Sequence, residues 1–461
     1  MAQKENGSKA YVLALTLVAT LGGLLFGYDT AVISGAVGSL KAYFIDSRHL
    51  GVDAGNSLLG WATSSALLGC IIGGAIAGLA SNRLGRKRAM IAAALLFLSG
   101  AIGTALPNQL IVFVLFRIVG GIGVGMASML SPMYIAEIAP AAIRGRLVSW
   151  NQFAIIFGML VVYFVNWGIA LQGNESWLNT TGWRWMFASG AIPSFLFLVA
   201  LFFIPESPRW LMMKARNDEA FGVLAKVGGQ GHAAAEADEI RKSLLQERGK
   251  IFSFGTLLVL IGIMLSVFQQ ITGINVILYY APEIFKKMGS TTNASLLQTI
   301  IVGAVNLLFT VIAILSVDKL GRKALMLIGY SGMCVGITGV GVTAFLNQAG
   351  LAMLMMMLLY IACFALAAGP VTWVLLSEIF PNKIRDSVMS IAVAAQWISN
   401  LAVSWTFPIL LGNVFLSDKF HGGFPFWIYG SMCVLSVLFI WKLVPETKGK
   451  TLEAMEALWK K

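Results

Sequence analysis

The chain alternates between long apolar runs and short polar segments along its whole length. Most of the runs contain 20 or more residues, the number that a helix needs to cross a hydrocarbon core about 30 Å thick. This pattern predicts an all-α membrane protein with twelve transmembrane helices, over residues 11–40, 56–81, 89–106, 108–136, 146–171, 183–204, 254–286, 294–316, 324–346, 351–380, 387–412 and 424–444. Runs longer than one crossing allow helix tilt or extension beyond the membrane.

One long polar stretch, roughly Pro205 to Phe252, separates the first six runs from the last six. The predicted organisation has four parts: an N-terminal six-helix half (1–204), a short helical linker domain (205–252), a C-terminal six-helix half (253–444) and a tail (445–461).

The two halves repeat one another in three ordered segments. The repeats are Asn82-Arg-Leu-Gly-Arg-Lys87 with Asp318-Lys-Leu-Gly-Arg-Lys323, Glu137-Ile-Ala-Pro-Ala-Ala-Ile-Arg144 with Glu378-Ile-Phe-Pro-Asn-Lys-Ile-Arg385, and Pro205-Glu-Ser-Pro208 with Pro445-Glu-Thr-Lys448. Duplicated halves imply a pseudo-two-fold arrangement with a cavity between them, a geometry that suits alternating access.

The composition supports this interpretation. Of 461 residues, 58% are hydrophobic and only 12% are charged, where a soluble protein has roughly 25% charged residues. Of the 33 Lys and Arg residues, 26 fall on the side of the N-terminus and six on the opposite side, while Arg117 lies within a span. Basic loops mark the cytoplasmic side, so both termini are expected there. The same loops explain the net charge of +12 without nucleic acid as a partner.

The chain lacks the motifs of an enzyme. Its four cysteines (Cys70, Cys334, Cys363 and Cys433) lie within apolar runs without Cys-x-x-Cys spacing, and its three histidines (His49, His232 and His421) stand far apart. Disulfides, a metal site and a nucleophile-base pair are therefore not expected. No phosphate-binding glycine motif is present either. We expect no enzymatic activity and no cofactor.

Two charged residues, Asp29 and Arg117, lie well within the predicted spans. At 1.5 Å per residue they sit about 18 Å and about 13 Å below the outer helix ends, which makes a pair plausible. A static salt bridge that fixes helix packing is one interpretation. The other is a titratable switch, in which protonation of Asp29 releases Arg117. We favour the switch.

A second group of intramembrane residues is neutral: Gln152, Gln269, Gln270, Asn275, Asn306 and Gln396, accompanied by the aromatic residues Phe26, Tyr279, Trp373 and Trp397. Carboxamides donate and accept, which matches the hydroxyls of a sugar, while flat rings cover its C–H faces. Interhelical hydrogen bonds are the alternative role of each amide. Gly273 and Pro282 in span seven, and Gly369-Pro370 in span ten, are expected to break or bend these helices at the cavity.

The chain resembles the sugar porter branch of the major facilitator superfamily, most closely the bacterial D-xylose:proton symporters. The resemblance covers essentially the whole chain. It rests on the paired Leu-Gly-Arg-Lys loops together with Gly22-Gly-Leu-Leu-Phe-Gly-Tyr-Asp29, Pro205-Glu-Ser-Pro-Arg-Trp-Leu211, Gln269-Gln-Ile-Thr-Gly-Ile-Asn275 and Pro445-Glu-Thr-Lys-Gly449.

This resemblance implies roles for individual residues. Sugar binding is implied for Gln152, Gln269, Gln270, Asn275, Asn306, Trp373 and Gln396, and a lining role for Phe26, Tyr279, Gly369 and Trp397. Asp29, partnered by Arg117, is implied to be the proton-coupling carboxylate. The related animal facilitators carry a neutral residue in its place, so its presence favours symport over uniport.

Family likeness further implies a cytoplasmic gate of latches between the halves, formed by Arg86, Glu137, Arg144, Glu206, Arg209, Glu378, Arg385 and Glu446. The chain departs from the family at Asp386, where glycine is usual, and this carboxylate is expected to compete for Arg385. The linker is expected to form short amphipathic helices against the cytoplasmic ends, with a solvated charged face and no ligand.

We therefore expect a monomeric carrier in a bacterial cytoplasmic (inner) membrane that imports D-xylose or a closely related monosaccharide with a proton. A facilitator that passes hexose down its gradient is the nearest alternative. A non-transporting sugar receptor is more remote, because the tail after Val444 is short for a signalling extension.

Overall fold

The computed structural model describes residues 7–140, 143–244, 251–287, 289–347, 350–448 and 459. Within these residues every regular element is a helix, and twelve helical segments are long and apolar enough to cross a membrane. The twelve predicted spans are therefore confirmed, and most ends differ from the expected ones by only a few residues. The first span continues past its expected end at residue 40 to Arg48, through a π-helical and a 3-10 turn. The sixth span begins earlier than expected, at Glu175, because a short helix and a π-helical turn precede its apolar part.

The N-terminal half consists of α1 (Lys9–Leu40), α2 (Val52–Leu84), α3 (Arg86–Ala105), α4 (Leu110–Ile138), α5 (Arg144–Ala170), α6 (Glu175–Trp177), α7 (Trp183–Ser189) and α8 (Ala191–Phe202). Three short helices follow in the linker: α9 (Pro208–Met213), α10 (Asn217–Gly228) and α11 (Gln230–Leu244).

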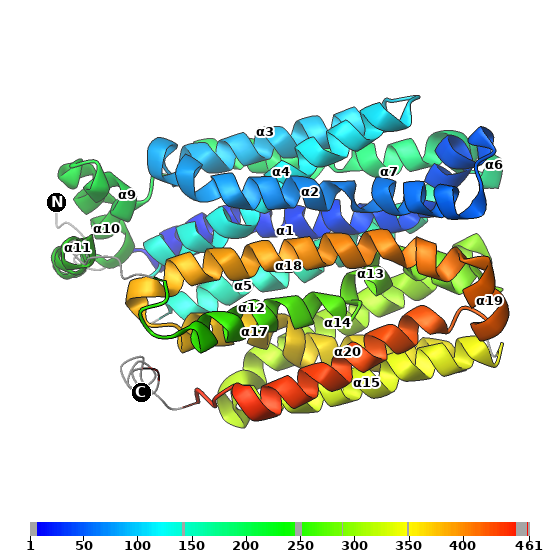
Figure 1. Ribbon diagram of the computed structural model, residues 1–461. Helices are drawn as coiled ribbons and strands as arrows, with labels where there is room; N and C mark the ends of the chain where they lie inside the picture. Colours follow the sequence, from blue (N-terminus) through cyan, green and yellow to red (C-terminus); the bar gives the residue numbers. More distant parts are fainter. Residues whose placement is uncertain are drawn as a thin grey trace.

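The C-terminal half consists of α12 (Thr256–Ile271), α13 (Ile274–Lys287), α14 (Thr292–Leu320), α15 (Arg322–Phe345), α16 (Leu351–Cys363), α17 (Gly369–Ile379), α18 (Asn382–Gly412), α19 (Val414–Phe420) and α20 (Phe424–Leu443). The two halves lie side by side (Figure 1). They meet where α2 packs against α18, α5 against α14, and α1 against α13.

The bundle has two distinct ends. At the end that we call the linker end, α1 begins, α20 finishes and α9–α11 lie outside the bundle (Figure 1). The opposite end, which we call the far end, carries α6 and α19 (Figure 1). An amphipathic linker folded as short helices at one end of the bundle agrees with the expectation from the sequence.

Two spans are interrupted, as expected. Span seven breaks between α12 and α13 at Gly273, whose φ of +90° is a conformation that glycine adopts without steric cost. Pro282 lies inside α13 and does not end it. Span ten contains a π-helical turn at Phe364–Ala368, directly before Gly369 begins α17. Irregular backbone of this kind frequently marks functional sites in membrane helices.

Candidate functional site

Asp29 on α1 and Arg117 on α4 form an ion pair inside the N-terminal half, as the sequence suggested. The distance from Arg117 Nη1 to Asp29 Oδ2 is 3.3 Å, and the same nitrogen donates to the Asp29 main-chain oxygen at 3.4 Å. The side chains are 3% and 16% exposed for Arg117 and Asp29 respectively. An ion pair this deep is stable only while each charge compensates the other.

The surroundings of the pair leave the guanidinium incompletely bonded. Among the described residues no group accepts a hydrogen bond from the buried Arg117 Nε. The Phe187 ring lies 5.5 Å from Arg117 Cζ, a distance at which a ring stabilises a cation. A cavity of about 10 Å³, lined in part by Asp29, Tyr28 and Ser194, adjoins the carboxylate. This volume is close to the minimum that one water needs.

Four of the predicted sugar-binding and lining residues are in direct contact at the break in span seven. The side chain of Gln269 donates to the main-chain oxygens of Ala368 and Gly369, at 2.8 and 3.1 Å. Gln270 donates to Gln269 Oε1 at 3.4 Å and accepts from Asn275 Nδ2 at 2.6 Å. The chain of amides thus connects α12, α13 and the start of α17.

Other members of the predicted site come from both halves. The ring of Phe26, on α1, lies 5.6 Å from that of Trp397, on α18, so an aromatic contact bridges the halves. Tyr279 on α13 is buried, and Trp373 on α17 is half-buried. No contact that joins Tyr279 or Trp373 to the amide chain is found among the described residues.

Three amides have no recorded contact with the others. The oxygens Asn306 Oδ1 and Gln396 Oε1 are buried and have no hydrogen-bond partner within the described ranges. Gln152 is half-buried on α5, which packs against the α14 helix that carries Asn306. A buried amide oxygen without a partner costs free energy, and a hydroxyl donor would remove that cost.

Predicted gate residues of the N-terminal half and of the start of the linker form a network at the linker end. Arg86 donates from Nε and Nη2 to the two oxygens of Glu137, at 2.8 and 2.7 Å. Glu206 accepts from the backbone N–H groups of Arg86 and Lys87, at the start of α3. Ser207 Oγ donates to Glu137 as well.

The C-terminal half and the start of the tail repeat this network with equivalent residues. Arg322 donates from Nε and Nη2 to the two oxygens of Glu378, at 3.1 and 2.9 Å. Glu446 accepts from the backbone N–H groups of Arg322 and Lys323. Our sequence analysis missed Arg322, although the repeated Leu-Gly-Arg-Lys motif carries the necessary signal.

The predicted latches between the halves are not among these bonds. In this conformation Glu137 and Glu206 bond to Arg86 at the start of α3, and Glu378 and Glu446 bond to Arg322 at the start of α15. A latch between the halves stays a prediction. Arg144 instead pairs with Glu236 of the linker helix α11, at 3.0 Å.

Two further gate residues are Arg385 and Arg209. Arg385 donates to the main-chain oxygen of Phe380 at 3.0 Å, which mirrors the Arg144 bond to Ala139. Arg209 is exposed and has no recorded side-chain partner among the described residues. The side chain of Asp386 lies outside the described part of the structure, so its competition for Arg385 stays a prediction.

At the far end, hydrogen bonds do join the halves. Trp405 Nε1, on α18, donates to the main-chain oxygen of Ser57 on α2 at 3.1 Å, and the Trp405 ring contacts Trp61. Tyr163 on α5 donates to the main-chain oxygen of Leu278 on α13 at 3.1 Å. Sequence analysis missed these residues because the acceptors of both hydrogen bonds are main-chain oxygens, which are present in every residue and form no sequence motif.

The match to a family model decides what kind of protein carries this geometry. The model described as "Sugar (and other) transporter" matches residues 15–459. The chain belongs to this family of sugar transporters. Its fold is the major facilitator fold, and it is a multi-pass membrane transporter, not an enzyme.

Individual members of the sugar transporter family are closely similar to the chain. The D-xylose-proton symporter of Escherichia coli (strain K12) is 56% identical, over 98% of this chain and 96% of the relative. The glucose facilitated diffusion protein of Zymomonas mobilis is 38% identical, over 99% of each chain. The partially occluded inward-open structure of the E. coli xylose transporter superposes with a TM-score of 0.88 at 53% identity, covering 96% of this chain and all of that one.

Proposed function

We propose that this transporter imports a monosaccharide, D-xylose foremost, together with a proton across a bacterial cytoplasmic membrane by alternating access. The single observation that carries the proposal is the loose Asp29–Arg117 pair, a titratable group buried in a sugar transporter. The name of the 56% identical relative, a D-xylose-proton symporter, supports both the sugar and the coupling ion.

Asp29 is the proposed proton carrier. While Asp29 is ionised, Arg117 Nη1 is held at its carboxylate. Protonation removes the charge that attracts the guanidinium, and the Phe187 ring remains as its partner. The balance between helix arrangements then changes, because the two protonation states stabilise α1 and α4 in different relative positions.

The sugar lies in the proposed site between the halves. The amides of Gln270 and Asn275, and the unpartnered oxygens of Asn306 and Gln396, bind hydroxyls. The contact between Phe26 and Trp397 offers aromatic faces at the boundary of the two halves. Gln152, Gln269, Tyr279, Gly369 and Trp373 complete the proposed binding and lining set.

The linker end is proposed to face the cytoplasm, with both termini inside, and the protein to act as a monomer. The structure then corresponds to an inward-facing state, because hydrogen bonds that join the halves within the described ranges lie toward the far end. The division into residues 1–204, 205–252, 253–444 and 445–461 belongs to the same proposal.

A facilitator is the second candidate, favoured by the 38% identity to a glucose facilitated diffusion protein. Uptake of labelled xylose into proteoliposomes separates the two functions. A symporter accumulates the sugar above the external concentration when the outside is acidified, and unlabelled pentoses compete more strongly than hexoses. Uptake that stops at equal concentrations under the same gradient contradicts the proposal.

A further inference from the structure

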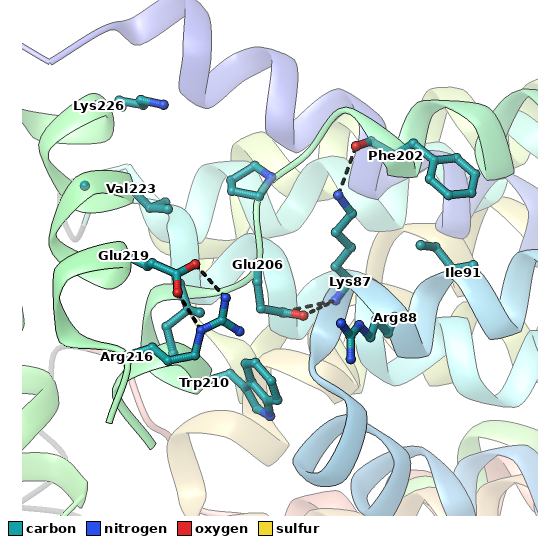
Figure 2. A pocket seen from close by; sticks show the side chains of 13 residues that line it. Lys87, Arg88, Ile91, Phe202, Glu206, Trp210, Arg216, Glu219, Val223 and Lys226 are labelled. Atoms are coloured by element: carbon teal, nitrogen blue, oxygen red, sulfur yellow. Dashed lines mark hydrogen bonds and ion pairs between the residues drawn. The ribbon is translucent and has the colours of Figure 1, made fainter. Parts of the chain in front are cut away.

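A second cavity, of about 600 Å³, lies at the linker end (Figure 2). Its walls come from the start of α3, the end of α8, and the linker helices α9 and α10. All of them belong to the N-terminal half and the linker, so the cavity is separate from the sugar site between the halves.

The cavity carries an excess of positive charge. Four basic residues line it, Lys87, Arg88, Arg216 and Lys226, against the carboxylates of Glu206 and Glu219. Both carboxylates already accept hydrogen bonds from groups of the protein. Glu219 accepts two bonds of 2.6 Å from Arg216, and Glu206 accepts from the backbone at the start of α3 (Figure 2).

Two of the cations remain available to a ligand. Lys87 Nζ donates to the main-chain oxygen of Phe202 at 2.9 Å. The side chains of Arg88 and Lys226 have no hydrogen-bond or ion-pair partner among the described residues. They come from different walls, Arg88 from α3 and Lys226 from α10 (Figure 2). Both charges attract an anion into the cavity between these walls, where either side chain can donate to it.

Part of the apolar lining lies at the membrane ends of two spans. Ile91 is on α3 and Phe202 ends α8, where Phe202 is 61% and its neighbour Phe203 81% exposed. Large aromatic side chains this exposed in a membrane protein face lipid. The cavity therefore joins a basic chamber to a lipid-facing surface.

We infer that the cavity binds an anionic phospholipid of the leaflet at the linker end. The phosphate lies in the basic part of the cavity, where Arg88 and Lys226 supply the positive charge, and the acyl chains run along Ile91 and Phe202. The bound lipid ties α10 to α3 and stabilises the linker against the N-terminal half. This assigns a ligand to a linker whose charged face the sequence suggested to be merely solvated.

Thermal unfolding of the full-length protein in zwitterionic detergent tests this site. Phosphatidylglycerol is titrated against phosphatidylcholine, with inorganic phosphate as a third arm. Phosphatidylglycerol is expected to raise the unfolding midpoint by several degrees more than phosphatidylcholine does, with one molecule retained in native mass spectrometry. An equal effect of the two lipids, or an equal increase with inorganic phosphate alone, overturns the inference.

Variants locate the binding. Arg88→Gln with Lys226→Gln is expected to lose most of the phosphatidylglycerol-specific increase. The control, Arg241→Gln with Lys242→Gln, removes the same charge from the exposed end of α11. This control variant is expected to retain the phosphatidylglycerol-specific increase.

A second substitution tests the cavity without changing its charge. A side chain added at Gly222 meets open space, so Gly222→Leu fills the cavity while the fold is kept. It is expected to abolish lipid retention. If the Arg88 and Lys226 double variant and Gly222→Leu both retain phosphatidylglycerol as well as the Arg241 and Lys242 control does, the proposed lipid site is wrong.

Discussion

Arg117 reaches Asp29 through one nitrogen only, with hydrogen bonds of 3.3 and 3.4 Å to the carboxylate and the main-chain oxygen. The Arg86–Glu137 pair differs, because two nitrogens donate to two oxygens at 2.7 and 2.8 Å. Bidentate pairs hold geometry, whereas a long single contact separates at lower cost. The protein therefore contains a tight pair where two helices are fixed and a loose pair where a proton is proposed to act.

Replacement of Gln270 by Ala should weaken sugar binding. It removes an amide from the proposed site and leaves Asn275 Nδ2 without its 2.6 Å acceptor, so the expected cost is about 1 to 3 kcal/mol. Calorimetry on purified protein measures this. Gln172→Ala, which removes an exposed amide at the end of α5, should bind like the wild type. Equal affinities of both variants would exclude Gln270 from the sugar site.

The duplicated networks should contribute unequally to stability. Arg86 and Glu137 side chains are 6% and 10% exposed, whereas Arg322 and Glu378 are 12% and 29% exposed. Removal of one partner costs more where the remaining charge is better shielded from water. Arg86→Ala should therefore lower the thermal unfolding midpoint more than Arg322→Ala. The reverse order in the same detergent would show that burial does not govern these pairs.

A side chain at Gly60 should prevent closure of the far end. A Cβ atom there would meet the Trp405 main-chain oxygen across the boundary between the halves. Gly60→Val should favour outward-facing states, slow net transport and retain sugar binding. Spin labels at positions 174 and 419 should move apart. Gly168→Val, where a Cβ meets open space, is the matched control, and an unchanged label distance in Gly60→Val contradicts the closure.

Glu446 should make stability depend on pH. Burial raises the pKa of its carboxyl, but four backbone N–H donors outweigh burial and hold the pKa below its ordinary value: those of Lys448, Arg322, Lys323 and Thr447. Its contribution is therefore present above the unfolded pKa, about 4.3, and is lost as the pH falls through the folded value.

Glu446→Gln should consequently unfold at a lower temperature near pH 7 and lose less stability than the wild type on acidification below about pH 5. Unfolding midpoints across a pH series measure this. Glu175→Gln, at the exposed start of α6, should follow the wild-type curve. Parallel curves for Glu446→Gln and the wild type would contradict a stabilising role of the ionised carboxylate.

Much of the fold could be read from local pattern, because each apolar run is long enough to form a span by itself. The break at Gly273 was also predictable, since few residues other than glycine adopt its φ of +90°. The Asp29–Arg117 pair could be predicted from the similar depths of the two residues in their spans. An isolated charge inside a bilayer costs free energy, and pairing with an opposite charge lowers that cost.

Contacts that depend on the arrangement of the halves were not predictable. Trp405 and Ser57 are 348 residues apart, and the acceptor is a main-chain oxygen. Every residue has such an oxygen, so the residue type gives no sign of the bond. The contacts of the gate carboxylates in this conformation could not be predicted either, because alternating access gives such residues different neighbours in different states. The role of Arg322, by contrast, could have been predicted, because the internal repeat places it at the position of Arg86.

Asp29→Asn tests the central claim most directly. The substitution keeps the size of the side chain but makes it permanently neutral, so the carrier can no longer exchange a proton with each sugar. Proteoliposomes with an imposed pH gradient measure accumulation, and counterflow under equal pH reports folding and sugar exchange. The account predicts that Asp29→Asn loses uphill accumulation of xylose and retains counterflow. Accumulation against the sugar gradient by this variant would place proton coupling elsewhere and leave Asp29 as a structural partner of Arg117.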